Sequence, residues 1–551
     1  MDRIIITFED GTKKEYPRAI TLRKIIEDVQ ENYEHEIICA KFKNQIINYD
    51  DVIMKSGELV FYDITNPEGN KIYERGLIFL FVTCTMKVLG KDTKIKIRHP
   101  IDKGIYCEID KKITDKELEE IKKLMTEKVK ENLPFKEIET SRIEAIEYFK
   151  KIKRYDKVKT LSYNTSNIVK LYKLDGVYNY IIGNIPKETG ILKKFDLTKI
   201  DDKGIVLRYP FTYNNGKIKK YEYHEKYVKS LDEYSNWANL LNINNVGELN
   251  EAIIKEGTGE IINLSETLQE HKLFTIAEEI HKNKKDIKIV LLSGPSSSGK
   301  TTTSKKLALY LKTLGLKPHP LSLDDYFLER DETPLGDNGR PDFESLRAID
   351  INLFNKQLKK LLEGHQVTTP TFNFVTGKKE FKKTLKLEEN DILIIEGLHT
   401  LNEELTKEIP SKNKYKIYLS PLTFLNIDDD NRISLTDIRL LRRIVRDYYT
   451  RGYSPATTIK TWIDVRKGEE KYVFPFQDEA DVIFNTFLAY EFGVLKTYVE
   501  PLLYSVTPDD PGYDTAIRLL EILKLVLPIP SENVPKLSIL REFIGGSYFQ
   551  I

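Results

Sequence analysis

The chain has 551 residues, which is too long for one hydrophobic core and indicates several domains. Charged residues make up 31% of it, yet the formal net charge is only +1, which excludes a global basic field for nucleic acids or membranes. The three cysteines are widely spaced, so we expect no disulfides. No signal peptide is evident, and no apolar run reaches the ~20 residues of a membrane span, so we expect a cytoplasmic protein.

Residues 1–63 predict a small α+β module, with strands at 4–8, 37–42 and 58–62 around a helix at 22–32. Two segments, Ala40-Lys41-Phe42-Lys43-Asn44-Gln45 and Gly57-Glu58-Leu59, resemble a TGS domain. That domain is the β-grasp unit at the N-terminus of threonyl-tRNA synthetases. The resemblance implies a β-grasp fold for this module.

Residues 64–210 are similar to the editing-type domain of the same synthetases. The similarity lies in Pro67-Glu68-Gly69 with Ile72-Tyr73, residues 100–110, a helix expected at 115–132, Leu133-Pro134 and Ser141-Arg142-Ile143-Glu144-Ala145-Ile146. In that family, hydrolysis depends on an H-x-x-x-H pair and a later Cys and His. Here Phe79 and Thr83 stand at the histidine positions, and residues 180–186 contain neither Cys nor His. We expect a scaffold, substrate-capturing or regulatory role for this half, with contact to RNA as an open option.

Residues 211–285 form a Tyr- and Lys-rich connector with helices expected at 246–255 and 268–282. We expect this segment to bridge the synthetase-like half and a C-terminal domain at 286–505. The last segment, 506–551, shows helical spacing of Ala516, Leu519, Leu520, Leu523 and Leu527, which predicts a helical extension with a core-facing stripe.

The run from Ser293 to Thr302 fits the G-x-x-x-x-G-K-[ST] phosphate-binding loop at every fixed position. A buried strand expected at 287–292 precedes it and a helix at 302–314 follows it, which is the required order. Lys300 would reach the β- and γ-phosphates, and Thr301 would place its hydroxyl on Mg²⁺. The predicted ATP-binding residues are Gly294, Pro295, Ser296, Ser297, Ser298, Gly299, Lys300, Thr301 and Thr302.

Two further strands are expected to end in carboxylates. The segment 320–323 leads into Asp324, and the strand at 391–395 ends at Glu396 followed by Gly397. In an open parallel sheet, the strand ends line the ligand crevice. Asp324 could therefore accept the proton of an attacking hydroxyl, and Glu396 could be a ligand of Mg²⁺ or orient its ligands. A helix cap or a surface acid is the alternative interpretation of Asp324.

A basic helix is expected further along the chain. Arg439, Arg443 and Arg446 share one helical face, and Arg451-Gly452 follows. Such a face with a glycine break is typical of a lid that closes on a triphosphate and balances transition-state charge. A solvated basic surface is the alternative interpretation.

These motifs, in this order, resemble the uridine kinase and phosphoribulokinase family over about residues 287–505. The matching segments are Leu321-Ser322-Leu323-Asp324, Asp342-Phe343-Glu344 with Ala348-Ile349-Asp350, residues 370–375 (PTFNFV), Ile395-Glu396-Gly397, Leu441-Arg442-Arg443 to Arg446-Asp447, Arg451-Gly452 and Ala480-Asp481-Val482-Ile483. The resemblance implies a P-loop kinase with a parallel sheet flanked by helices. The whole chain is thus expected to combine α+β and α/β domains.

The resemblance also implies roles for individual residues. Asp324 would be the general base for a nucleoside 5′-hydroxyl, Glu344 would grip the ribose hydroxyls, and Phe343 would pack on the sugar or base. Lys300 would hold phosphates, Thr301 and Glu396 would hold the metal, and Arg443 and Arg446 would approach the phosphates and the substrate.

The positions that read the base depart from the family pattern. Phe372 and Gly377 replace a tyrosine and a histidine, Tyr453 replaces a lid arginine, and Thr461 falls near a glutamine position. Because specificity depends on hydrogen-bonding groups that the wrong substrate leaves unpaired, losing them should relax or shift the choice of base.

The sequence therefore predicts an ATP- and Mg²⁺-dependent kinase of a nucleoside whose base is uncertain. Two alternatives remain: a nucleotide-regulated RNA-binding or regulatory protein, and a kinase of another ribosyl or sugar-phosphate alcohol. The acidic surroundings of Glu344 favour neutral hydroxyls over a phosphate. The resemblance is compatible with a homo-oligomer, but the sequence itself does not determine the oligomeric state.

Overall fold

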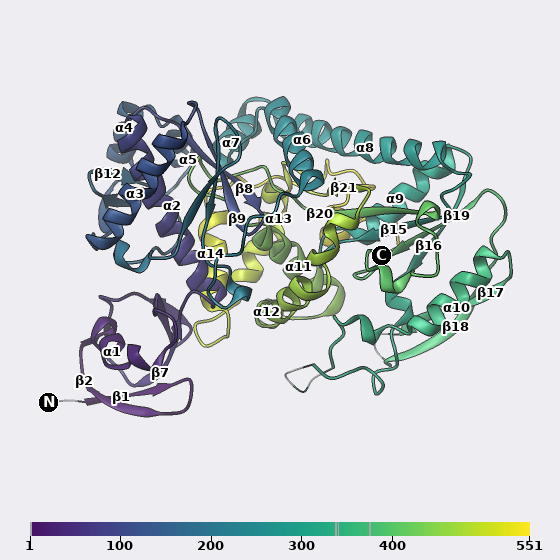
Figure 1. Cartoon of the computed structure of the whole chain (residues 1–551), viewed down its shortest axis with the longest axis horizontal. Helices are drawn as coiled ribbons and strands as arrows, with labels where there is room; N and C mark the ends of the chain where they lie inside the picture. The colour runs from purple at the N-terminus through teal and green to yellow at the C-terminus, as the bar shows by residue number, and fades with distance from the viewer. Residues whose placement is uncertain (1–2, 337–338, 340, 374–375, 551) are drawn as a thin grey trace.

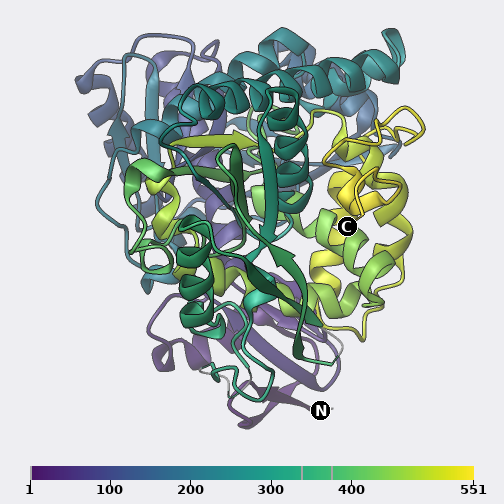
Figure 2. The same ribbon diagram turned by 90° about the vertical axis from the view of Figure 1, so that its right-hand side faces the viewer.

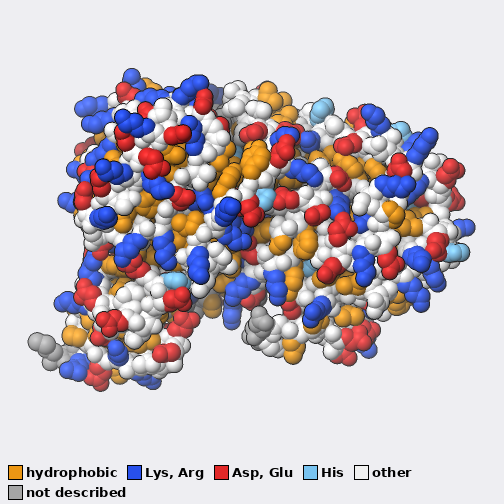
Figure 3. All heavy atoms as spheres, viewed as in Figure 1, with side chains coloured by type: hydrophobic (Ala, Val, Ile, Leu, Met, Phe, Trp, Pro, Cys, Tyr) orange, Lys and Arg blue, Asp and Glu red, His pale blue; other side chains and the backbone are white. Residues whose placement is uncertain are grey.

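The computed structural model describes residues 3–336, 339, 341–373 and 376–550. Figure 1 shows the N-terminal module at the lower left, the synthetase-like segment above it and the phosphate-loop sheet at the right. None of the helices within these residues combines the length and apolar content that crossing a bilayer requires. On the face shown in Figure 3, acidic and basic side chains are interspersed, as the balanced composition predicts.

The N-terminal module is a five-stranded mixed sheet with the strand order β2-β1-β7-β4-β5. Strands β1 and β7 pair in parallel, and the other neighbours pair antiparallel. Buried and exposed residues alternate along β1, so one face of the sheet packs on α1 and the other faces outward. The elements are β1 (Arg3–Phe8), β2 (Lys13–Pro17), β3 (Ile20–Thr21), α1 (Leu22–Val29), β4 (Cys39–Phe42), β5 (Gln45–Ile47), β6 (Val52–Ile53) and β7 (Gly57–Tyr62).

The next segment contains two antiparallel sheets and a long buried helix, α2 (Pro67–Leu89). Asn66 caps α2 by accepting the N–H groups of Glu68 and Gly69, and most of the helix is apolar because protein surrounds it. One sheet has the order β13-β14-β9-β8, and the other has the order β10-β11-β12. The remaining elements are β8 (Ile95–Ile101), β9 (Gly104–Ile109), α3 (Asp115–Lys130), β10 (Lys136–Ser141), α4 (Arg142–Lys151), α5 (Tyr155–Ser162), β11 (Ile168–Leu174), β12 (Val177–Asn179), β13 (Asp196–Lys199) and β14 (Gly204–Arg208).

Three helices connect this segment to the phosphate-loop sheet: α6 (Glu225–Leu241), α7 (Val246–Lys255) and α8 (Thr258–Lys282). Apolar residues of all three helices, among them Leu241, Leu249 and Ile276, belong to the same hydrophobic core as the sheet. The segment expected to be a connector is therefore integrated into the core of the C-terminal region, and α6 was not expected from the sequence.

The C-terminal region contains a five-stranded sheet in which every neighbouring pair is parallel, with the order β16-β19-β15-β20-β21. Its strands are β15 (Ile289–Ser293), β16 (Lys317–Ser322), β19 (Asp391–Glu396), β20 (Lys414–Ser420) and β21 (Val482–Asn485). Val290 and Leu292 pack on the side of α9 (Lys300–Thr313), whereas Ile289 and Leu291 pack on the side of α10 (Ile351–Leu362). Both faces are covered, which explains why the central strands are continuous apolar runs.

The remaining elements of the C-terminal region are a hairpin and several helices. The hairpin of β17 (Val367–Asn373) and β18 (Lys378–Leu385) projects beside α10 and faces the viewer in Figure 2. The C-terminal half supplies α11 (Leu435–Arg451), α12 (Pro455–Tyr472), α13 (Glu491–Tyr504), α14 (Tyr513–Leu523) and α15 (Arg541–Ile544). Ala516, Leu519, Leu520 and Leu523 are buried on α14 as expected, but the helix ends before Leu527, and only α14 and α15 are α-helical within the described part of 506–551.

Candidate active site at the phosphate loop

The phosphate loop connects β15 to α9 at the carboxyl edge of the parallel sheet. Gly294 has no room for a side chain, because a Cβ atom there would lie 2.3 Å from the carbonyl oxygen of Leu419. Gly299 has a φ of +87°, which favours glycine, and Ser297 also has a positive φ. These conformations wrap the loop around the N-terminus of α9, where a helix binds anions well.

Lys300 lies folded onto this loop. Its ammonium group donates to the carbonyl oxygens of Gly294 at 2.9 Å and Pro295 at 3.3 Å. Both acceptors belong to the loop that would surround a polyphosphate, so Lys300 is in place to exchange these contacts for phosphate oxygens.

Two carboxylates converge beside Lys300 from neighbouring strands. Glu396 ends β19, and its Oε1 atom accepts the Ser322 hydroxyl at 3.0 Å and lies 3.5 Å from the Thr301 hydroxyl. Asp324 lies in a short turn directly after β16, and its side chain reaches solvent while neighbouring protein atoms surround it. The structure thus brings together the predicted metal residues Thr301 and Glu396 and the predicted base Asp324.

The electrostatics of these acids follow from their enclosure. Burial raises the pKa of Glu396 to about 7, and the neighbouring Asp324 carboxylate adds to this effect, while Lys300 opposes it. Desolvation also raises the pKa of Asp324 against the influence of Lys300, Arg451 and Arg446. Buried acids with perturbed pKa values beside specific charge partners are typical of functional sites.

Glu344 lies near Asp324 and packs against Gly468 of α12, where a Cβ would lie 2.7 Å from the Glu344 Cβ atom. Burial and the nearby Glu469 raise the pKa of Glu344 to about 7, and Arg443 and Lys300 oppose the shift. Glu344 therefore lies close enough to Arg443 and Lys300 for their positive charges to influence it.

The arginines of α11, where a lid that closes on a triphosphate is predicted, contact the phosphate loop or buried carboxylates of the protein. Arg439 is buried and donates from Nε to the Ser296 carbonyl oxygen at 2.9 Å, and the neighbouring Arg442 is fully buried against Glu491. Arg443 donates to the Ser296 hydroxyl at 2.9 Å, and it shares Asp447 with Arg446. Since α11 packs in the core, a solvated basic face is excluded for Arg439, and its guanidinium supports the loop from behind.

Two residues of this site were missed in the sequence. Glu469 of α12 accepts the N–H of Ser296 at 2.8 Å and pairs with Arg439 and Arg466, so it fixes the tip of the loop. His399, three residues after Glu396, is buried against Tyr472, and burial lowers its pKa to about 4. Neither residue stands in a recognised motif, and only the fold brings Glu469 to the loop.

An aromatic cluster lies beside the acids. Phe327 contacts Phe343 and Phe372 edge-on, with ring centroids 6.1 Å and 5.8 Å apart, and Phe343 is 41% exposed. The Asp325 carboxylate accepts the N–H of Phe372 at 3.1 Å. At Gly377, which has a φ of +70°, a Cβ would lie 2.9 Å from the Arg330 Cβ. The motif residues Phe374 and Val375 lie outside the described part of the chain.

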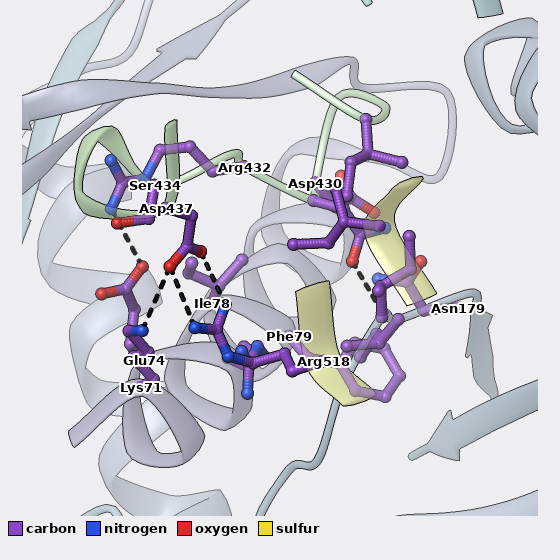
Figure 4. Close-up of a pocket in the computed structure, with 16 residues that line it drawn as sticks. Lys71, Glu74, Ile78, Phe79, Asn179, Asp430, Arg432, Ser434, Asp437 and Arg518 are labelled. Carbon is purple, nitrogen blue, oxygen red and sulfur yellow. Dashed lines mark hydrogen bonds and ion pairs between the residues drawn. The ribbon is translucent and has the colours of Figure 1, made fainter. Parts of the chain in front are cut away.

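The two residues at the expected histidine positions lie inside the protein. Phe79 and Thr83 are buried on α2, and a cavity of about 70 Å³ adjoins Phe79. Glu74 binds Arg432 at 3.2 Å across this junction. Figure 4 shows these side chains meeting from the two halves, together with Asp437, which binds Arg518 at 2.6 Å and Lys71 at 3.5 Å.

The N-terminal and C-terminal regions of the chain resemble different known proteins. The family model described as "Phosphoribulokinase / Uridine kinase family" matches residues 289–490. A uridine kinase of Borrelia duttonii is 31% identical over 202 residues, which cover 36% of this chain and 85% of that protein. The chain belongs to the phosphoribulokinase and uridine kinase family. Membership in this family supports ATP-dependent phosphoryl transfer to an alcohol of a nucleoside or sugar, and it confirms the resemblance predicted for the C-terminal region.

The N-terminal region has different relatives. A threonine–tRNA ligase of Caldanaerobacter subterraneus is 27% identical over 200 residues, which are 36% of this chain and 31% of the ligase. The chain thus spans less than a third of that relative, and the similarity covers the N-terminal part. The synthetase resemblance is confirmed at this level, while the TGS assignment stays a prediction.

Among solved structures, a possible uridine kinase from Bacillus stearothermophilus is 20% identical, with coverage of 36% of this chain and 89% of that chain and a TM-score of 0.22.

Proposed function

We propose that this family member transfers the γ-phosphoryl group of ATP to the 5′-hydroxyl of a nucleoside. The observation that carries the proposal is the convergence of Lys300, Asp324 and Glu396 at the carboxyl ends of adjacent parallel strands. This crevice is where ligands bind in open α/β sheets, and each of the three side chains suits one requirement of phosphoryl transfer.

The roles divide among these residues as follows. The loop amides and Lys300 would hold the phosphates, and Thr301 and Glu396 would hold Mg²⁺, which when bound neutralises charge on the β- and γ-phosphates. Asp324 would accept the proton of the acceptor hydroxyl as its oxygen bonds to the γ-phosphorus. The bond from that phosphorus to the β–γ bridging oxygen breaks, and ADP leaves. Arg443 and Arg446 would stabilise the charge that develops.

The surroundings favour a neutral ribosyl acceptor over a sugar phosphate. Asp324, Glu344 and Glu396 lie close enough to influence one another and give the site an acidic character. A carboxylate such as Glu344 can accept hydrogen bonds from the ribose hydroxyls, but it would repel a second phosphate. The exposed ring of Phe343 offers a stacking surface to a base.

The base preference is proposed to be relaxed. Phe372 offers no polar side-chain group, and Gly377 has no side chain at all, so two positions that read a pyrimidine in the family cannot hydrogen-bond to it here. An apolar wall discriminates only weakly between rings of similar shape. The site should therefore accept several bases with similar kcat/KM values.

An ADP-release assay of the purified full chain tests the function. ATP, Mg²⁺ and a panel of ribonucleosides and deoxyribonucleosides are supplied, with Lys300→Ala as the inactive variant and Lys312→Ala, an exposed position on α9, as its matched control. Turnover that requires a nucleoside and disappears only in Lys300→Ala supports the proposal. Absence of stimulation by every nucleoside contradicts it, and strong selectivity for uridine and cytidine contradicts the relaxed base preference.

A second candidate function follows from the ligase-like N-terminal region: RNA binding that is regulated by nucleotide. Electrophoretic mobility shifts of the full chain with structured RNA, with and without ATP, test it. Retention of RNA without any nucleoside-dependent ADP release would favour this function over the kinase.

A further inference from the structure

The C-terminal segment of the chain lies directly on the phosphate loop. The N–H of Thr302 in the first turn of α9 donates to Oε2 of Glu542 at 3.0 Å. Ile539 packs against Gly299, since a Cβ there would lie 2.5 Å from its Cγ2 atom. The two contacts involve nearby residues of one segment and two of the predicted ATP-binding residues, Gly299 in the motif and Thr302 directly after it.

The segment is anchored independently of Glu542. Arg541 donates to the carbonyl oxygens of Ser531 at 2.7 Å and Val534 at 2.8 Å, and Phe543 is buried with its ring 5.0 Å from the Arg442 guanidinium carbon. Leu540 and Ile544 are buried in the main core of the region. The backbone of α15 is therefore held in place by contacts that do not involve Glu542, and the Glu542 side chain is partly exposed to solvent.

The Glu542 carboxylate makes the kind of contact that a nucleotide phosphate would make. The first N–H groups of a helix have no partner within the helix and attract anions, and in a phosphate loop they are donors to the nucleotide. A carboxylate that accepts a hydrogen bond from such an N–H group uses a donor that the nucleotide would need. It also places a negative charge at the position where the negatively charged polyphosphate would bind. The N–H of Thr302 cannot donate a full hydrogen bond to Glu542 and to a nucleotide phosphate at the same time.

We propose that Glu542 is an autoinhibitory plug of the nucleotide site, which must leave the Thr302 N–H before ATP binds fully. This inference rests on the proposed nucleotide binding of the loop. If the plugged arrangement is dominant in the free chain, the apparent dissociation constant is raised by the inverse of the open fraction. An open fraction of about one tenth would weaken ATP binding about tenfold.

Isothermal titration with ATP and Mg²⁺, without acceptor, tests this inference on the full chain. The variants are Glu542→Ala and Glu542→Asp, and Glu532→Gln changes an exposed carboxylate of the same segment as a control. Glu542→Asp keeps the negative charge but shortens the side chain. It therefore distinguishes loss of the hydrogen bond to Thr302 from loss of charge repulsion between residue 542 and ATP. It also serves if Glu542→Ala does not fold.

The plug predicts that both variants bind ATP about five to ten times more tightly than the wild-type chain, with no change in Glu532→Gln. Equal or weaker binding in Glu542→Asp overturns the inference while leaving the kinase proposal intact. Tighter binding in Glu542→Ala alone also overturns it, because charge and not the contact would then be responsible. Failure of every chain to bind ATP overturns both proposals.

Discussion

The Thr301 hydroxyl lies 3.5 Å from Oε1 of Glu396, across the gap between the start of α9 and the end of β19. A hydroxyl and a carboxylate at this separation are oxygen ligands that one Mg²⁺ can share, directly or through its waters. The same carboxylate oxygen accepts the Ser322 hydroxyl, so its orientation is fixed from the neighbouring strand.

This arrangement predicts a metal phenotype. Glu396→Gln keeps the shape and the contact with Ser322 but removes the charge, so the Mg²⁺ concentration for half-maximal activity should rise about tenfold or more. Kinetics at varied Mg²⁺ and saturating ATP measure it. Glu388→Gln, an exposed position before β19, should behave like the wild-type chain. An unchanged Mg²⁺ requirement would remove Glu396 from the metal site.

Substitution of Phe343 tests whether its ring forms part of the proposed nucleoside pocket. Because Phe343 is 41% exposed, Phe343→Ala should cost little stability. Loss of the stacking surface should raise the KM for the nucleoside by about fivefold to a hundredfold, with a smaller change in kcat. Steady-state kinetics with ATP saturating measure both parameters. Phe381→Ala, at a 51% exposed position on β18, is the control. A KM equal to that of the control would place the base elsewhere.

Glu344 should give the stability of the free chain a specific pH dependence. Its pKa is raised to about 7 in the folded chain, against about 4.3 when exposed. Between these values the folded state holds a proton that the unfolded state releases, so this group's contribution to stability falls as pH rises from about 4.3 to 7. In Glu344→Gln, the decline of the thermal midpoint over this range should be smaller. Glu332→Gln is an exposed control, and parallel curves for all three chains would disprove the raised pKa.

Asp437 joins the two halves of the molecule. Burial favours its neutral acid, but Arg518 and Lys71 hold its pKa below the ordinary value. Removing one partner of such a buried pair leaves an unpaired charge, so Asp437→Ala should lower stability by about 3 to 5 kcal/mol. Chemical denaturation measures the loss, with exposed Asp509→Asn as the control. A loss below 1 kcal/mol would show that the junction does not depend on this pair.

The phosphate loop and the two strand-end acids could be predicted because their signals are local. The apolar runs that became β15 and β19 are buried on both faces; β15 leads directly into the phosphate loop, and β19 ends at Glu396. The helix at 246–255 was likewise predicted at its observed bounds, since its apolar periodicity is strong.

The support of the loop could not be predicted because its partners are distant in sequence. Glu469 reaches Ser296 across 173 positions, and Glu542 reaches Thr302 across 240. Arg439 has the helical spacing of an exposed basic face, yet its guanidinium is buried because Glu469 balances its charge. A sequence pattern records which face a residue lies on, but not which carboxylate the fold brings to it.

The most direct test of the kinase mechanism is the mass of the product formed by wild-type chain and by Asp324→Asn from ATP, Mg²⁺ and a mixture of nucleosides. Asp331→Asn, an exposed acid downstream, is the matched control. We predict nucleoside monophosphates from the wild-type and control chains, and at least a hundredfold less from Asp324→Asn, because no other group is assigned to accept the hydroxyl proton. Wild-type yields from Asp324→Asn, or no nucleoside monophosphate from the wild-type chain, would contradict this account.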